Sequence, residues 1–224
     1  MKLYATPIAP NALRVEIFML EKGIVAEVID ISALAAGEFS KINPFGQVPA
    51  LELDNGEVIT ESLTICRYLD EVSGEPKLFG STPEERARIG MWERRAELLL
   101  FIPSVEYGHH THAMFAGLIT QYPEWAMTLV PKALRMVDAM AEQLDRTAFL
   151  AGDELSAADL TAALGYTGLI AFGALAPSAH PSVQRWSRAI MARPSMAPLL
   201  KAAEYLKNAT AAEPQIVAEA EGSH

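Results

Sequence analysis

The hydrophobic pattern of the chain changes near residue 75, and this change constrains the fold more than any other feature. Before it, short β-rich runs and helical spacing alternate in the order β-α-β and then β-β-α. After the linker S-G-E-P-K-L-F-G-S-T-P, the spacing is helical throughout. This order predicts a mixed sheet covered by helices and then an all-helical unit. We expect domains over residues 1–75 and 83–206, followed by a tail over 207–224.

Turn and cap signals mark the elements of the first unit. The run L-Y-A predicts a strand, and Gly23 stands where a C-terminal cap would end the first helix. A second strand is expected in V-A-E-V-I-D-I. Asn55-Gly56, between A-L-E-L and E-V-I, predicts a hairpin turn. The stretch between the second strand and the hairpin is expected to be irregular. A further helix is expected over 63–72, after the hairpin.

The second unit contains only helical signals. Long helical stretches are expected from Pro83 to about residue 115 and over 123–146, with shorter helices over 181–192 and 195–206. Between them, Ser156 precedes Asp159 by three residues, which is the spacing of a capping box. We therefore interpret this pair as a folding element rather than as a catalytic pair.

Composition excludes several classes of protein. The net charge is −10, and residues 1–75 carry 5 basic and 12 acidic side chains, so we expect no nucleic-acid partner. No apolar run approaches the roughly 18 residues of a membrane span, and Met1-Lys2-Leu3-Tyr4 leads directly into a strand, so we expect neither a membrane span nor a signal peptide. A single cysteine, Cys66, indicates a reducing compartment. We expect a cytoplasmic protein that does not bind a membrane.

Two further segments could bind a ligand. Val48-Pro49 directly precedes a strand, so the backbone of Val48 could pair with a peptide-like ligand; alternatively, it is only a rigid turn. Ser62 at a helix start could hold a carboxylate, and Glu61 an ammonium group. Alternatively, Ser62 caps the helix and Glu61 complements its dipole.

Several motifs resemble those of bacterial glutathione S-transferases. They are V-E-I-F-M-L-E-K-G-I, F-G-Q-V-P-A-L-E-L-D-N-G and E-S-L-T-I-C-R-Y-L-D-E, followed later by L-A-G-D-E-L-S-A-A-D-L and H-P-S-V-Q-R-W. The resemblance extends from Met1 to about Leu206. It implies a thioredoxin-like N-terminal domain, a helical C-terminal domain, a homodimer and a cis Val48-Pro49 bond.

The resemblance also implies a binding site for glutathione. The Val48 backbone would pair with the cysteinyl part, Glu61 and Ser62 would hold the γ-glutamyl end, and Gln47 would lie nearby. Relatives often carry a basic or imidazole contact to the glycyl end where this chain has Gly46, so Lys41 is the candidate replacement. No metal is expected.

The segment T-P-I-A-P-N, ahead of the first helix, contains neither serine nor cysteine. A site there could use the thiol of glutathione, because a helix N-terminus and nearby donors favour the thiolate. Ala9 occupies the position at which serine-type relatives carry their hydroxyl. Asn11 is the first candidate donor and Thr6 the second; Asn11 could equally cap the helix. Cys66 lies a full turn inside a helix and is expected to be buried and inert.

The motif Y-G-H-H-T-H-A-M-F lacks the acidic or thiol ligands that would complete a usual zinc shell. In the family this region borders the pocket for the electrophile. The candidate lining residues are therefore Tyr107, His110, Met114 and Phe115, with interhelical packing as the alternative.

The expected function is conjugation of glutathione to small apolar electrophiles. Glutathione-dependent reduction of peroxides or disulfides needs the same thiolate and remains an alternative. A non-catalytic protein-binding module is the third possibility, motivated by Ala9 and Gly46.

Overall fold

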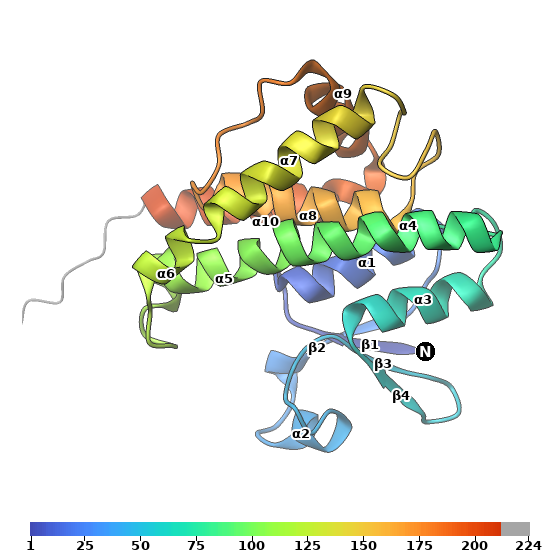
Figure 1. The fold of residues 1–224 in the computed structure, drawn as a ribbon. Coiled ribbons are helices and arrows are strands. Elements are labelled where there is room, and N and C mark those ends of the chain that lie inside the picture. Colours follow the sequence, from blue (N-terminus) through green and yellow to red (C-terminus); the bar gives the residue numbers. More distant parts are fainter. Residues whose placement is uncertain (212–224) are drawn as a thin grey trace, which may run out of the picture.

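A computed structural model describes residues 1–211, although the side chains of 207 and 209–211 are not described. Figure 1 shows a small sheet with its helices below a larger group of helices. The elements of the N-terminal unit are β1 (Lys2–Ala5), α1 (Pro10–Lys22), β2 (Glu27–Asp30), η1 (Ile31–Ala33), α2 (Glu38–Ile42), β3 (Ala50–Glu52), β4 (Val58–Thr60) and α3 (Ser62–Val72).

The four strands form one mixed sheet in the order β2-β1-β3-β4. β1 and β2 are parallel, and β3 is antiparallel to both β1 and β4. The predicted hairpin is confirmed: Gly56 has a φ of +85°, and Asn55 Oδ1 accepts a hydrogen bond from Glu57 N at 3.0 Å. The short helix α2 falls in the stretch expected to be irregular, so that expectation is wrong.

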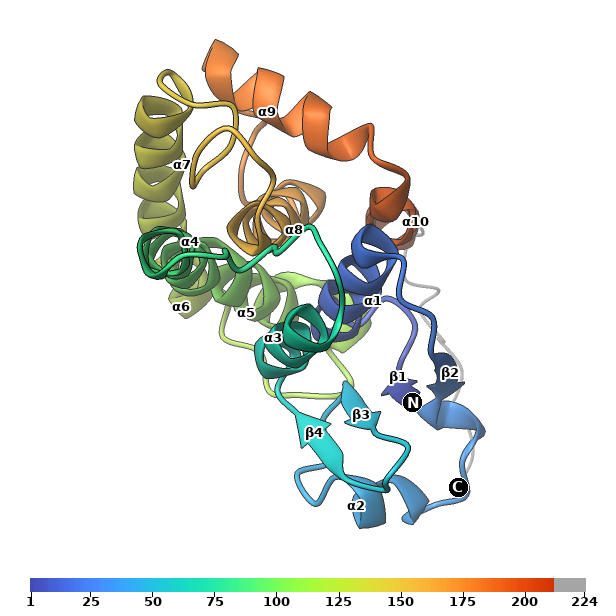
Figure 2. The same ribbon diagram turned by 90° about the vertical axis from the view of Figure 1, so that its right-hand side faces the viewer.

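Alternate strand residues face opposite sides of the sheet, as the period of a strand requires. Leu3 and Leu51 are buried in the main core with α1 and α3, whereas Tyr4 and Ala50 pack with Phe39 of α2. Figure 2 shows α1 and α3 between the sheet and the helical unit, and α2 on the far side of the sheet. The helix α1 therefore packs against both units.

The helical unit contains α4 (Pro83–Ala96), the π-helical turn η2 (Glu97–Phe101), α5 (Ile102–Thr111), η3 (Ala113–Phe115), α6 (Pro123–Met127), α7 (Val130–Leu144), α8 (Ala157–Ala171), α9 (Pro181–Met191), η4 (Pro194–Met196) and α10 (Ala197–Ala211). The stretch expected over 123–146 is divided into α6 and α7, and Pro131 lies at the start of α7. α10 continues past residue 206, where the tail was expected to begin. The rest of that tail, from 212, lies outside the described residues.

α8 is the central helix of this unit and is buried over most of its length. A Cβ at Gly165 would lie 2.5 Å from the backbone of Leu100 and Phe101, so glycine permits α8 to approach η2 closely. The predicted capping box is confirmed at the start of α8, where Asp159 accepts hydrogen bonds from Ser156 N and Ser156 Oγ at 3.0 and 2.8 Å. Asp159 also accepts from Trp186 Nε1 of α9 at 2.9 Å.

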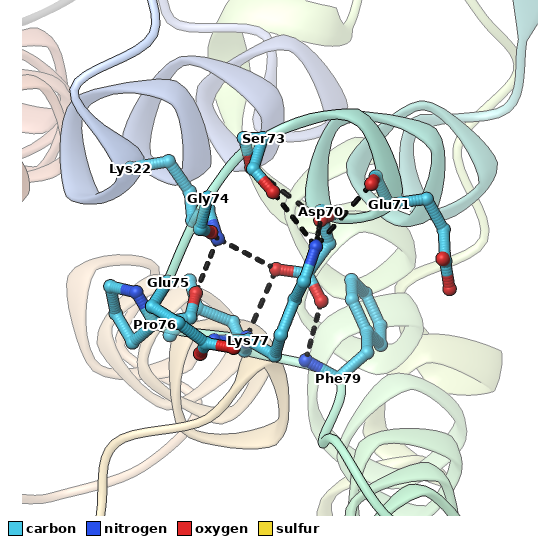
Figure 3. A network of polar contacts seen from close by, with 10 residues as sticks. Lys22, Asp70, Glu71, Ser73, Gly74, Glu75, Pro76, Lys77 and Phe79 are labelled. Atoms are coloured by element: carbon cyan, nitrogen blue, oxygen red, sulfur yellow. Dashed lines mark hydrogen bonds and ion pairs between the residues drawn. The ribbon is translucent and has the colours of Figure 1, made fainter.

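A network of polar contacts fixes the linker between the two units (Figure 3). Asp70 of α3 accepts hydrogen bonds from Leu78 N and Phe79 N at 3.0 and 3.1 Å and forms an ion pair with Lys22 of α1. Lys77 donates to the carbonyl oxygen of Ser73 at 2.8 Å. Since the Asp70 carboxylate is buried, these donors replace its lost hydration.

Candidate active site

Three segments meet at one end of the sheet, and the strand register brings them together. Tyr4 pairs with Ala50, and Ala50 pairs with Thr60. The turn after β1, the Val48-Pro49 dipeptide before β3 and the start of α3 after β4 therefore lie at the same end. The candidate residues of the glutathione site come from these three segments.

The turn before α1 leaves backbone donors available. Ala9 is the N-terminal cap residue and has no side-chain hydrogen bond to offer, while Pro10 occupies the first helical position. Because the first N–H groups of a helix have no intrahelical partner, those of Asn11 and Ala12 point out of the helix start. Ile8 has a φ of +61°, which is unfavourable for a β-branched residue. The turn is thus held in a sparsely populated conformation beside the first N–H groups of α1.

Asn11 and Ser62 are joined by a hydrogen bond between α1 and α3. Ser62 Oγ donates to Asn11 Oδ1 at 2.8 Å, and Ser62 is buried. With its oxygen used in this way, the Asn11 side chain presents its Nδ2 hydrogens as donors. Both capping interpretations are wrong: Ala9 and Glu61 are the cap residues, and neither side chain caps its helix. Sequence spacing gave no signal of this contact.

Glu61 stands immediately before α3 in an unusual backbone conformation. Its φ is +66° and its ψ is 112°, outside the regions that non-glycine residues prefer. Its side chain is exposed and forms no hydrogen bond or ion pair with the residues that the structure describes. Such an outlier costs on the order of 1–3 kcal/mol and is typical of ligand-binding positions.

The Val48-Pro49 bond is cis, as the resemblance implied. Within the described part of the chain, the Val48 N–H has no hydrogen-bond partner. Asn43 is buried and shapes the preceding loop, because its Nδ2 donates to Gln47 O at 2.6 Å and its Oδ1 accepts from Phe45 N at 3.2 Å. Sequence reasoning missed Asn43, although an Asn-Pro pair commonly initiates a turn.

Gln47 is exposed in the same loop, beside Val48. Lys41 belongs to α2 and pairs with Glu38 one helical turn earlier, at 2.6 Å. Both side chains of that pair are well exposed, so Lys41 lies in solvent rather than in a pocket that could bind an anion. The structure therefore brings Gln47 to the site and places Lys41 on the neighbouring short helix.

A cavity of about 350 Å³ lies between the turn before α1 and the helical unit. Thr6 and Ala9 contribute to one wall, and Met114 and Phe115 to another. The lining is mainly apolar. α8 contributes a wall of small residues that includes Gly168 and Ala171.

Two of the four predicted lining residues lie outside the cavity. Tyr107 is buried, with its hydroxyl 3.7 Å from Met127 Sδ of α6. His110 Nδ1 accepts a hydrogen bond from Tyr122 N at 3.2 Å, and its ring packs against Trp125. The helical period explains the difference, since residues 107 and 110 share the face of α5 that is turned toward α6. Val105 and His109, four residues apart, face the cavity instead.

Cys66 is buried, and burial raises the pKa of its thiol to about 12. It is therefore an inert thiol, as expected. Across residues 1–211, no group of three or more His, Cys, Asp or Glu side chains is arranged to hold a metal ion. In the same range, no helix combines the length and the apolar character that crossing a bilayer requires.

Comparisons with known proteins assign the two units. Residues 8–72 match the model of the glutathione S-transferase N-terminal domain, and residues 103–194 match that of the C-terminal domain. Glutathione S-transferase 2 of Saccharomyces cerevisiae is 33% identical over 209 residues, which cover 90% of each chain. The chain belongs to the glutathione S-transferase family.

Other members of the family extend the likeness. Glutathione S-transferase 3 of Zea mays is 30% identical over 217 residues, covering 87% of this chain and 90% of its own. A solved structure of a glutathione S-transferase domain-containing protein from Marinobacter aquaeolei superimposes with a TM-score of 0.77 at 33% identity, covering 88% of this chain and all of that one. The thioredoxin-like domain, the helical domain and the glutathione transferase class of enzyme are confirmed. Membership implies glutathione as co-substrate.

Proposed function

We propose that this transferase binds glutathione at the end of the sheet and ionises its thiol beside Asn11. The observation that carries the proposal is the Ser62–Asn11 hydrogen bond, which turns the Asn11 amide into a directed donor. The backbone N–H groups at the start of α1 add a partial positive charge. A thiol with an ordinary pKa of about 8.5 would ionise more readily there. Thr6 is the second donor, and Ala9 contributes only its backbone.

The rest of the tripeptide would extend from α1 toward α3. The Val48 N–H would bind the cysteinyl backbone beside Pro49, and the Glu61 carboxylate would bind the γ-glutamyl ammonium group; neither group has a partner among the described residues. Ser62 N–H at the start of α3 would hold the adjacent carboxylate. Gln47 would lie along the peptide, and Lys41 would contact the glycyl end only after leaving Glu38. No metal takes part in this scheme.

The cavity would hold a small, mostly apolar electrophile close to the sulfur. Met114 and Phe115 would contact it, as would the small residues of α8. Tyr107 and His110 would support this wall from behind rather than contact the substrate. Burial of an apolar molecule here contributes about 25 cal/mol per Å² of surface removed from water.

Glutathione titration combined with ultraviolet absorbance of the bound thiolate tests the proposal. The wild type should bind glutathione and show thiolate absorbance at neutral pH, whereas Asn11→Ala should bind it with much less absorbance. Asn11→Asp should reduce the absorbance further, because a carboxylate would repel the thiolate. Equal absorbance in all three proteins would contradict the role of Asn11.

The same experiment tests two alternative functions. Reduction of peroxides or disulfides would use the same thiolate, and product analysis separates it from conjugation. A non-catalytic module is favoured by the lack of a side-chain donor at Ala9. Binding without ionisation in the wild type would support the module.

We also propose a cytoplasmic, bacterial-type homodimer. Met91, Leu98 and Ile102 are exposed and follow one another at intervals of seven and four residues along α4, η2 and α5. This spacing places them on one face of the helical run, which a second copy would cover. Sedimentation velocity should give a dimer, and Leu98→Glu should convert it to a monomer.

A further inference from the structure

The glycyl end of the proposed ligand would lie beside the loop that precedes β3. In the proposed function, the cysteinyl backbone pairs with Val48 and the γ-glutamyl end lies at the start of α3. The rest of the peptide must therefore continue in the other direction, along Gln47 and toward α2. Glutathione ends there in the glycyl carboxylate, and an anion that leaves water needs a positively charged or hydrogen-bonding partner.

The segments around this position contain almost no cations. Within residues 23–66, Lys41 is the only lysine, arginine or histidine. The same stretch contains seven acidic residues, which are Glu27, Asp30, Glu38, Glu52, Asp54, Glu57 and Glu61. The helical unit does not compensate for them near the cavity, because residues 96–131, which include α5, η3 and α6, contain no lysine or arginine. The charge around the site therefore disfavours an added carboxylate.

Lys41 is paired with a carboxylate of its own helix. Its Nζ lies 2.6 Å from Glu38 Oε1, one turn earlier in α2, and the two side chains are 72% and 50% exposed. An exposed pair of this kind contributes little to stability. A ligand carboxylate that drew Lys41 away would, however, leave the Glu38 charge unpaired beside it. The pair as a whole is neutral, so α2 gives a glycyl carboxylate no net attraction.

The loop between α2 and β3 presents only neutral groups. Asn43 is buried, and both ends of its amide are used inside the loop. Gly46 has no side chain, and its φ of +65° disfavours any other residue at that position. Gln47 is exposed. Its amide contains both a donor and an acceptor, so it can pair with a carboxamide as well as with a carboxylate.

We propose that this site binds γ-glutamylcysteinylglycine thiols whose C-terminal carboxyl group is an uncharged amide at least as readily as it binds glutathione. Glu38 is the specificity-determining residue, because it holds the lysine that could otherwise pair with a free glycyl carboxylate. The inference rests on the proposed function and broadens the thiol substrate of the same site. The chemistry at sulfur is unchanged, because the amide alters only the far end of the peptide.

Calorimetric titration of the full-length protein with glutathione and with glutathione amide, in which the glycine ends in a carboxamide, tests the inference. A lysine or arginine placed for the carboxylate would make the amide bind about 10- to 100-fold more weakly, the usual value of a hydrogen bond to a charged group. We expect instead that the amide binds within threefold of glutathione, or more tightly. Both bound thiols should show the same thiolate absorbance.

Two variants and a control extend the test. Glu38→Gln releases Lys41 and should lower the Kd for glutathione about two- to fivefold, with the Kd for the amide unchanged. Gln47→Lys adds a cation beside Val48 and should give the same selective gain. Glu57→Gln removes an equal charge from the hairpin at the opposite end of the sheet, so the ratio of the two Kd values should stay as in the wild type.

The outcomes separate this inference from the proposed function. If the amide bound more than threefold more weakly than glutathione, the inference would be overturned and the proposed function would stand. Identical behaviour of Glu38→Gln and Glu57→Gln would overturn the role of Glu38. If the wild type bound neither thiol, the proposed function would fail, and this inference with it.

Discussion

Ser62 donates its hydroxyl hydrogen to Asn11 Oδ1 across 2.8 Å, and this contact joins the starts of α1 and α3. The two residues lie 51 positions apart in sequence. The same hydrogen bond determines which end of the Asn11 amide is free. The site for the thiol therefore depends on a residue that belongs to the other half of the N-terminal domain.

Ser62→Ala should weaken retention on immobilised glutathione and reduce the thiolate absorbance of the bound tripeptide, because Asn11 is then free to rotate. The free energy of unfolding should change by no more than about 1–2 kcal/mol, the value of one hydrogen bond. Ser73→Ala is the control, since Ser73 directly follows the far end of α3 and its hydroxyl makes, among the described residues, only a weak hydrogen bond to Asp70 O at 3.5 Å. Unchanged retention would remove Ser62 from the site.

Asp159→Ala should be strongly destabilising. The carboxylate accepts hydrogen bonds from Leu150 N, Ser156 and Trp186 Nε1, all in the buried centre of the helical domain. The substitution leaves these donors unsatisfied, and we expect a loss of about 3 kcal/mol or more in urea unfolding. Asp153→Ala, at an exposed position in the loop that precedes α8, should cost far less. Similar losses for the two variants would contradict this account.

Gly165→Ala should also destabilise the protein, by about 1–3 kcal/mol, because the added methyl group meets the backbone of η2. Gly90 offers a matched control on α4, where a Cβ would meet nothing within 4 Å. Gly90→Ala should raise stability by up to about 1 kcal/mol through helix propensity. Thermal unfolding of both variants measures these changes in stability. If Gly165→Ala left the stability unchanged, α8 would be able to move away from η2.

The contact of α1 with η4 should give a pH-dependent contribution to stability. Burial disfavours the Glu21 carboxylate, but hydrogen bonds from Arg193 and Ser195 outweigh it and lower the pKa of Glu21. A lowered pKa stabilises the fold above the unfolded value of about 4.3, and this contribution is lost as the pH falls through the folded pKa. Glu21→Gln should therefore lower Tm at pH 7, and its difference from the wild type should shrink below about pH 4.

Glu16→Gln on the same helix is the matched control. Burial raises the pKa of Glu16, so its charge does not stabilise the fold, and Tm at pH 7 should stay the same or rise slightly. A constant difference between Glu21→Gln and the wild type across the acid range would contradict the ion-pair explanation.

Local signals predicted most of the fold. The Asn55-Gly56 turn, the Gly23 cap and the Ser156–Asp159 box each depend on neighbouring residues, and the structure contains all three. The short helix α2 was missed because five residues are too few to show a period. The boundary between α6 and α7 was missed because both helices follow the same hydrophobic spacing.

The site was less predictable because it depends on contacts between distant segments. Asn11 and Glu61 were identified from the motifs, yet the Asn11–Ser62 bond follows only from the packing of α1 on α3. In the motif Y-G-H-H-T-H-A-M-F, Met114 and Phe115 line the cavity, whereas Tyr107 and His110 do not. Which of its histidines faces the cavity depends on the rotation of the helix, and that rotation is fixed by Gly108 against Phe172.

The small residues of α8 give the cavity a width that single substitutions can change. A side chain larger than that of Ala171 would narrow the space, and a Cβ at Gly168 would approach Ser104 Oγ to 2.1 Å. Neither position belongs to the three segments that would bind glutathione. Substitution of these small residues of α8 by slightly larger ones could therefore exclude bulky electrophiles from the cavity, while the residues proposed to activate the glutathione sulfur stay unchanged.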